Sequence, residues 1–319
     1  MRRQIDGTAI IAMVSLCLVW GMQQVSIKAV ADNIAPVFQI GLRSGIAAVL
    51  VLLVSKLFLR ERWIQGVALG PGLLVGTLFA LEYLLVAEGL RWTTASHIAV
   101  FLYTAPIFAA IGLHLVVPEE KLNSVQWAGI GLAFAGVAVI FVGPELLRGR
   151  SSIGPAMLLG DSLGLLAGAA WGFTTVALRA TRLGAAPPTQ TLFYQLLAAF
   201  GGLMLYALIT GQVGIDPTPL VVMSMGFQTL VVSVASFLVW FWMLRRYMVS
   251  RLGVLTFMSP LFGVVLGALL LGESLEPSFV AGAALVLSGM VLVNGSEWLA
   301  TRRTMPDTRK GPSVQAPRG

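Results

Sequence analysis

The feature that most constrains this chain is a series of ten long apolar runs, nearly all about the 20 residues that a helix needs to cross a bilayer core. The runs lie at roughly 7–29, 36–56, 66–88, 95–117, 125–142, 155–178, 189–210, 219–243, 252–272 and 278–297. Only 11% of the 319 residues are charged, against about 25% in an ordinary globular domain, so most of the surface must face lipid. The sequence therefore predicts an all-α integral membrane protein with ten transmembrane helices and no soluble domain.

The positions of the basic residues predict the orientation, because short loops rich in Lys and Arg stay in the cytoplasm. A cytoplasmic N-terminus places sixteen Lys and Arg residues inside and four outside, with Arg43 left within the second span. Both termini are therefore expected in the cytoplasm, and the last segment, 301–319, is polar and basic enough to predict a disordered tail. The net charge of +7 is explained by topology, and no nucleic-acid partner is expected.

The two halves of the chain are similar to each other, which predicts a repeat at 1–149 and a second at 150–300. At an offset of 151 or 154 residues, rare residue types recur: Trp20 with Trp171, Lys28 with Arg179, Gln39 with Gln190, Pro106 with Pro260 and Glu119 with Glu273. A one-residue slip then aligns Gly129 with Gly282 and Gly136 with Gly289. Each repeat holds five spans, an odd number, so the second must be inverted in the membrane. Inverted repeats place a binding site near the membrane midplane and permit alternating access.

These motifs resemble those of the EamA-type branch of the drug/metabolite transporter superfamily. The resemblance covers about residues 7–298 and is carried by Leu18-Val19-Trp20-Gly21 with Lys28, and by Tyr103-Thr104-Ala105-Pro106 and Phe257-Met258-Ser259-Pro260 before Glu119 and Glu273. It implies a carrier of the bacterial inner membrane that exports amino acids or other small metabolites. A narrower similarity to the aromatic-amino-acid exporters rests on no particular residue. Uptake or facilitated transport of a nucleoside, a sugar or a drug-like compound is the alternative.

The candidates for solute binding are aromatic side chains near the middle of the spans, together with polar ones in the outer half of the first-repeat spans and on the inner side of the second. Polar groups are costly in lipid and usually face a cavity or each other, and aromatic rings suit apolar or amphipathic solutes. The alternative for the rings is ordinary helix packing. The candidates are Trp20, Gln23, Gln24, Glu82, Tyr83, Tyr103, Trp171, Thr174, Phe237 and Phe257.

Charged residues within the spans carry a second set of predictions. Arg43 needs an anion, and Glu82 is its expected partner, either as a static ion pair or as groups that meet a charged solute or a coupled proton. His97 is expected at the solvated rim, and Asp161 is expected as an exposed acid near a helix start.

Proline and glycine predict how the helices bend and approach. Pro106 and Pro260 lie near the middle of their spans, where proline removes a backbone donor, so both are expected to kink the helix and act as paired hinges. Fixed bends are the alternative. Gly160, Gly164, Gly168 and Gly172 recur every four residues and predict a stripe along which a neighbouring helix approaches closely.

Other function classes find little support. The chain has no phosphate-binding Gly-x-x-x-x-Gly-Lys-Ser/Thr loop and no catalytic motif of a membrane enzyme. Cys17 is the only cysteine, which excludes an internal disulfide and a multi-cysteine metal site. We therefore expect a secondary transporter rather than an enzyme, a monomer without cofactor or metal, whose partners are the bilayer, a small solute and protons as coupling ion.

Overall fold

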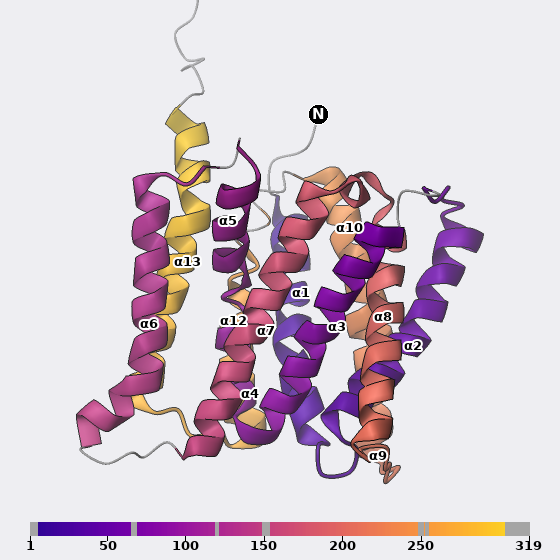
Figure 1. Cartoon of the computed structure of the whole chain (residues 1–319), viewed down its shortest axis with the longest axis horizontal. Coiled ribbons are helices and arrows are strands. Elements are labelled where there is room, and N and C mark those ends of the chain that lie inside the picture. Colours follow the sequence, from indigo (N-terminus) through magenta and orange to yellow (C-terminus); the bar gives the residue numbers. More distant parts are fainter. Residues whose placement is uncertain are drawn as a thin grey trace, which may run out of the picture.

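The computed structural model describes residues 6–64, 69–118, 121–148, 154–247, 252 and 255–303, and these residues form a bundle of helices (Figure 1). Eight helical segments of the described chain have the length and hydropathy to cross a membrane, and Met258–Leu271 and Pro277–Val293 are shorter apolar helices. The ten-helix, all-α prediction is confirmed. Residues 301–303, predicted as the start of the tail, instead belong to the last helix, while Glu119 and residues 304–319 lie outside the described residues.

The helices of the first repeat follow the predicted apolar runs closely. They are α1 (Gly7–Ala29), α2 (Pro36–Leu53) with the π-helical turn Val54–Phe58, α3 (Leu69–Trp92), α4 (Ala95–Leu102), α5 (Ala105–Val116) and α6 (Ser124–Arg148). Asp6 begins α1 by accepting a hydrogen bond from the Ala9 amide at 2.8 Å, and Thr94 begins α4 in the same way through the His97 amide at 3.1 Å. Both contacts satisfy backbone donors that a helix start leaves unpaired.

The helices described in the second repeat follow the order of the first, and most of the segment that matches α4 lies outside the described residues. They are α7 (Pro155–Ala180), α8 (Pro188–Ile209), α9 (Pro219–Gly226), the π-helical segment η3 (Phe227–Ser236), α10 (Phe237–Arg246), α12 (Met258–Leu271) and α13 (Pro277–Arg303). The segments α9, η3 and α10 follow one another without a gap and form a single span. Proline stands in the first turn of α2, α7, α8 and α9, where its missing N–H costs no hydrogen bond.

Counterpart helices of the two repeats pack against each other at opposite sides of the bundle. In Figure 1, α6 lies along α13 at one side, α2 lies near α8 at the other, and α1, α3, α4, α5, α7 and α12 fill the space between. The start of α1 and the end of α13 lie at the same end of the bundle. An inverted duplication predicts both features.

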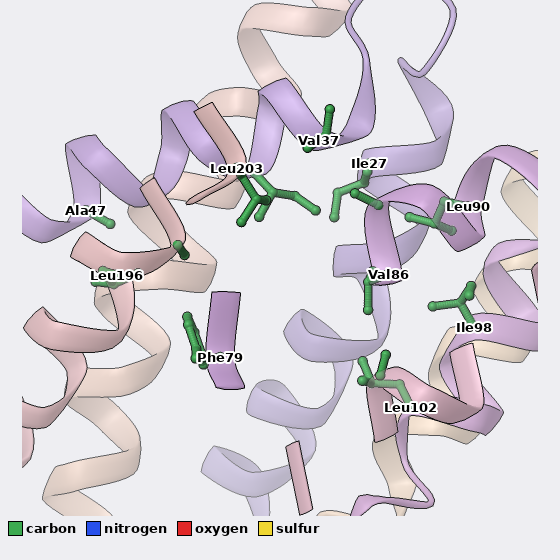
Figure 2. Packing of buried hydrophobic residues seen from close by; sticks show 14 of the residues in the cluster. Ile27, Val37, Ala47, Phe79, Val86, Leu90, Ile98, Leu102, Leu196 and Leu203 are labelled. Carbon is green, nitrogen blue, oxygen red and sulfur yellow. The ribbon is translucent and has the colours of Figure 1, made fainter. Parts of the chain in front are cut away.

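A cluster of buried aliphatic and aromatic side chains joins α1, α2, α3, α4 and α8 (Figure 2). Ile27, Val86, Ile98 and Leu203 are among its fully buried members. Large apolar side chains such as Leu208 are instead exposed on the outside of the bundle. Exposed leucines fit a surface that faces lipid, where apolar side chains need no cover.

The two mid-span prolines follow breaks in their helices. Residues Tyr103 and Thr104 form a turn between α4 and α5, and Pro106 lies in the first turn of α5. Thr256 and Phe257 form the corresponding turn before α12, which contains Pro260 in its first turn. Proline clashes with the carbonyl group four residues earlier, so a helix is interrupted on its N-terminal side. The predicted kinks are therefore complete breaks, placed alike in both repeats.

Candidate functional site

A cavity of about 440 Å³ lies between the two repeats at the middle of the bundle. Both repeats contribute to its wall. It is lined by Trp20, Gln23, Gln24, Phe79, Glu82, Tyr83, Leu102, Tyr103, Pro106, Trp171, Leu178, Gln195, Val232, Phe237, Trp240 and Thr256. Its volume falls within the usual range for small-molecule sites, about 300–1,000 Å³, and its wall combines aromatic rings with a few polar groups, as such sites do.

Eight of the ten solute-binding candidates line this cavity, and Thr174 and Phe257 do not. The Thr174 hydroxyl donates to the Ala170 carbonyl oxygen at 2.9 Å, within its own helix. Phe257 lines a separate apolar cavity of about 510 Å³ between α12 and α13. The candidates also omit lining residues, among them Val232, which stands in the π-helical segment η3. Hydrophobic periodicity does not reveal a π-helix, although such segments are frequent at functional sites.

The two repeat-related tryptophans each contact an aromatic ring of the opposite repeat. Trp20 meets Trp240 edge to face at 5.6 Å between ring centroids, and its indole N–H donates to the Ser236 hydroxyl at 3.0 Å. Trp171 meets Tyr103 edge to face at 5.3 Å. Both rings therefore join the two repeats at the cavity, although their partners, Trp240 and Tyr103, are not repeat-related.

The predicted direct ion pair between Arg43 and Glu82 is absent from the described part of the chain. The Arg43 guanidinium instead stands over the Tyr83 ring, 5.0 Å from its centroid. Arg43 Nε and Nη1 and Glu82 Oε2 are buried without a hydrogen-bond partner. The guanidinium therefore contacts Tyr83, the residue next to Glu82, where an ion pair with the Glu82 carboxylate was expected. This cation–π interaction could not be predicted from the sequence spacing.

A second polar cluster lies at the end of the bundle where α4 and α7 begin, and it corrects two predictions. His97 and Asp161 are buried, with 4% and 0% of their surface exposed, rather than solvated at the rim and at a helix start. His97 Nδ1 lies 2.9 and 3.0 Å from the two Asp161 carboxylate oxygens, and the Thr93 hydroxyl donates to the same carboxylate at 2.5 Å. The imidazole ring stacks on Phe279 at 4.1 Å between centroids.

The glycine stripe of α7 explains why Asp161 is covered. A β-carbon at Gly160 would lie 2.8 Å from Thr93, and one at Gly168 would lie 2.6 Å from the Phe101 carbonyl oxygen. The predicted close approach along this stripe is confirmed, and its partner is the chain from the α3–α4 turn into α4. That approach buries the carboxylate, which short-range sequence signals cannot show.

Two family-motif residues hold the same turn. Lys28 donates to the carbonyl oxygens of Leu90 and Thr93 near the end of α3. Glu273 accepts from the Ala95 and Ser96 amides at 2.6 and 2.9 Å, at the start of α4. A cation at a helix C-terminus and an anion at an N-terminus are both favoured by the helix dipole. Residues of both repeats therefore close this end of the bundle.

The cavity extends toward the opposite end. Leu178 lies in the last turn of α7, Gln195 lies early in α8, and Trp240 lies in α10. In Figure 1 these segments lie at the end where α1 begins, away from the start of α4. The arrangement is a cavity between two repeats with polar contacts across one end, as a carrier open to one side at a time requires.

Comparison with known proteins shows which family has this architecture. The model of the EamA-like transporter family matches the chain twice, at residues 7–142 and 158–295. A protein of known crystal structure superposes with a TM-score of 0.60 over 94% of this chain and 100% of that one, at 17% sequence identity, which concerns the fold alone.

Several transporters are similar to this chain in sequence along nearly their whole length. The uncharacterized transporter YoaV of Bacillus subtilis is 25% identical over 88% of this chain and 95% of its own. A probable amino-acid metabolite efflux pump of Escherichia coli is 27% identical over 92% and 96%, and one of Salmonella typhimurium is 25% identical over 86% and 91%. The chain belongs to the EamA-like transporter family and is a multi-pass membrane transporter.

Proposed function

We propose that this protein exports small metabolites, in particular amino acids with neutral or aromatic side chains, across the bacterial inner membrane by alternating access. The observation that carries the proposal is the cavity between the repeats, whose wall combines aromatic rings with amide and phenol groups. Rings of this kind bind apolar side chains through burial and stacking, and the polar groups orient the solute.

The direction of the cavity matches the inward-facing state in which an exporter takes up its solute. With the N-terminus in the cytoplasm, as the excess of inside Lys and Arg predicts, the cavity extends toward the cytoplasm. The contacts of Lys28, Glu273 and the His97–Asp161 pair then close the outer end. A solute would enter from the cytoplasm, and separation of these contacts would release it outside.

Counterflow in proteoliposomes tests this function. We expect labelled phenylalanine to accumulate faster when unlabelled phenylalanine is present on the opposite side, because a carrier returns faster when loaded. Uptake into inside-out and right-side-out vesicles, with and without a proton gradient, would reveal the direction and whether protons are coupled. Counterflow of a nucleoside or a sugar in place of every amino acid would favour the alternative solutes, and flux without any counterflow would indicate a channel.

Trp171→Ala is expected to weaken solute binding. The substitution removes an aromatic ring from the cavity wall, and with it the buried area and the ring contact, worth about 0.5–1.5 kcal/mol, that an aromatic solute would gain there. The apparent affinity for phenylalanine in counterflow should fall by about tenfold or more. Trp127→Ala is the matched control, because Trp127 is 46% exposed on α6 and does not line the cavity. Equal affinities in both variants would place the solute elsewhere.

Pro106→Ala and Pro260→Ala test whether the two helix breaks are hinges. Alanine restores a backbone donor and removes the clash, so each broken span should tend to become continuous. If the breaks move during transport, both variants should fold normally and turn over more slowly in counterflow. They should also shift the accessibility of introduced cysteines toward opposite sides. Pro219→Ala, in the first turn of α9, is the control. If Pro106→Ala and Pro260→Ala show the same turnover and cysteine accessibility as this control, the two breaks are fixed bends and not hinges.

A further inference from the structure

The cavity wall is electrically asymmetric. Among the lining residues that the structure describes, Glu82 is the one carboxylate, and there is no Lys, Arg or His. The remaining polar groups of the wall are amides, hydroxyls and indoles, which carry no charge. A solute anion in this cavity would therefore meet a carboxylate and no cation, whereas a solute cation would meet a counterion.

Two hydrogen-bond acceptors of the wall are buried without a partner. Glu82 Oε2 on α3 and Gln24 Oε1 on α1 accept no hydrogen bond in the structure, and the residues are 5% and 2% exposed. A buried acceptor without a donor is energetically unfavourable, and the cost is larger for a charged group. Both atoms are acceptors, so the missing partner is a donor.

Arg43 does not supply that donor. It is outside the cavity wall, its guanidinium is held over the Tyr83 ring, and it forms no ion pair with Glu82. The carboxylate thus remains free to meet a group that arrives in the cavity.

Aromatic faces complete the environment. Trp20, Tyr83, Tyr103 and Trp171 all line the same cavity. An ammonium group is attracted to the face of an aromatic ring, most strongly where water is excluded. It also carries donors that could satisfy a carboxylate and an amide oxygen together.

We propose that Glu82 and Gln24 form an ammonium-binding subsite and that the solutes are primary amines carrying an aromatic or apolar body. The proposal rests on the transport function proposed for this cavity and narrows its substrate class. The amine is the group that the wall recognises, and the carboxylate of an amino acid is not required for binding. Aromatic amines without a carboxylate therefore belong to the substrate range.

A series of probes of similar shape tests the subsite by calorimetric titration of the purified full-length protein in detergent. The probes are phenethylamine and phenylalaninamide, which are cations, 3-phenylpropanoate, which is an anion, and 3-phenylpropanamide, which is neutral. The two cations should bind at least about tenfold more tightly than the neutral amide, as a charge-assisted hydrogen bond implies. The anion should bind most weakly.

Substitution then assigns the recognition to Glu82. Glu82→Gln should weaken phenethylamine binding by about tenfold or more and change binding of the neutral amide by less than about threefold. Glu88→Gln is the matched control on the same helix, because Glu88 pairs with Arg91 and does not line the cavity. Gln24→Met should also weaken binding of the two cations, and it serves as a second variant if Glu82→Gln does not fold.

Three outcomes would overturn the subsite. The first is that 3-phenylpropanoate binds as tightly as phenethylamine. The second is that Glu82→Gln lowers the affinity for the cationic and the neutral probes equally. The third is that neither cation binds to the unmodified protein. Counterflow of another solute alongside any of these results would leave the transport function standing, so the two failures are distinguishable.

Discussion

Gly289→Leu is expected to destabilise the protein strongly by forcing α6 and α13 apart. A β-carbon at Gly289 would lie 2.7 Å from both the Ala133 nitrogen and its β-carbon, and would also meet the Gly129 carbonyl oxygen. Backbone atoms cannot move aside as a flexible side chain can. Overpacking costs about 1–3 kcal/mol and occasionally more, and we expect the upper end, about 3 kcal/mol. Loss of helical circular dichroism on heating in detergent measures the change.

Gly131→Leu is the control for this prediction. Gly131 lies on α6, is exposed, and has nothing within 4 Å of a β-carbon. Leucine is a better helix former than glycine by somewhat under about 1 kcal/mol, so this variant should be as stable as the unmodified protein or slightly more so. Equal melting temperatures for the two variants would show that α6 and α13 do not need their close approach.

The α6–α13 contact also identifies the symmetry of the fold. Gly129 faces Gly289 and Gly136 faces Gly282, each with a carbonyl oxygen where a β-carbon would stand. The repeat alignment matches Gly129 with Gly282 and Gly136 with Gly289. Each contact is therefore the image of the other, and the pseudo-twofold axis passes between the two helices. The alignment came from sequence alone, but only the structure shows which glycine faces which.

The course of the spans could be predicted because lipid imposes a simple rule. Every backbone polar group in the bilayer must be satisfied within a helix, so apolar runs of about 20 residues become helices with little influence from their neighbours. The run at 7–29 coincides with α1, and the breaks before Pro106 and Pro260 follow from local sterics. The π-helical segment η3 was missed, because nothing in its composition distinguishes it from an α-helix.

The polar contacts were harder to predict because they depend on residues far apart in the chain. Arg43 and Glu82 were assigned to each other by charge alone, whereas the guanidinium contacts Tyr83, 5.0 Å from the ring centroid. His97 and Asp161 are 64 residues apart and join opposite repeats. The order of residues along a span indicates how deep a side chain lies in the membrane, but not which neighbour covers it.

The buried pair at the end where α4 and α7 begin leads to the second large effect. Asp161→Ala removes the acceptor of both the His97 imidazole and the Thr93 hydroxyl, and leaves both groups buried without a partner. Breaking a buried pair by removing one member costs about 3–5 kcal/mol. We expect a loss of this size in the free energy of unfolding, measured by chemical denaturation in mixed micelles.

Asp32→Ala is the control, because Asp32 is an exposed carboxylate just after α1, at the same end of the bundle. A substitution of this kind changes stability by no more than about 0.5 kcal/mol. Asp161→Asn separates charge from hydrogen bonding, since its amide oxygen still accepts from Thr93. If charge dominates, Asp161→Asn should be nearly as unstable as Asp161→Ala; if hydrogen bonding dominates, it should recover most of the loss. Stability of Asp161→Ala equal to that of the Asp32→Ala control would mean that the pair does not hold the repeats together. The closure of this end would then rest on its other contacts, such as those of Lys28 and Glu273 and the Asn33–Asp216 hydrogen bond between the repeats.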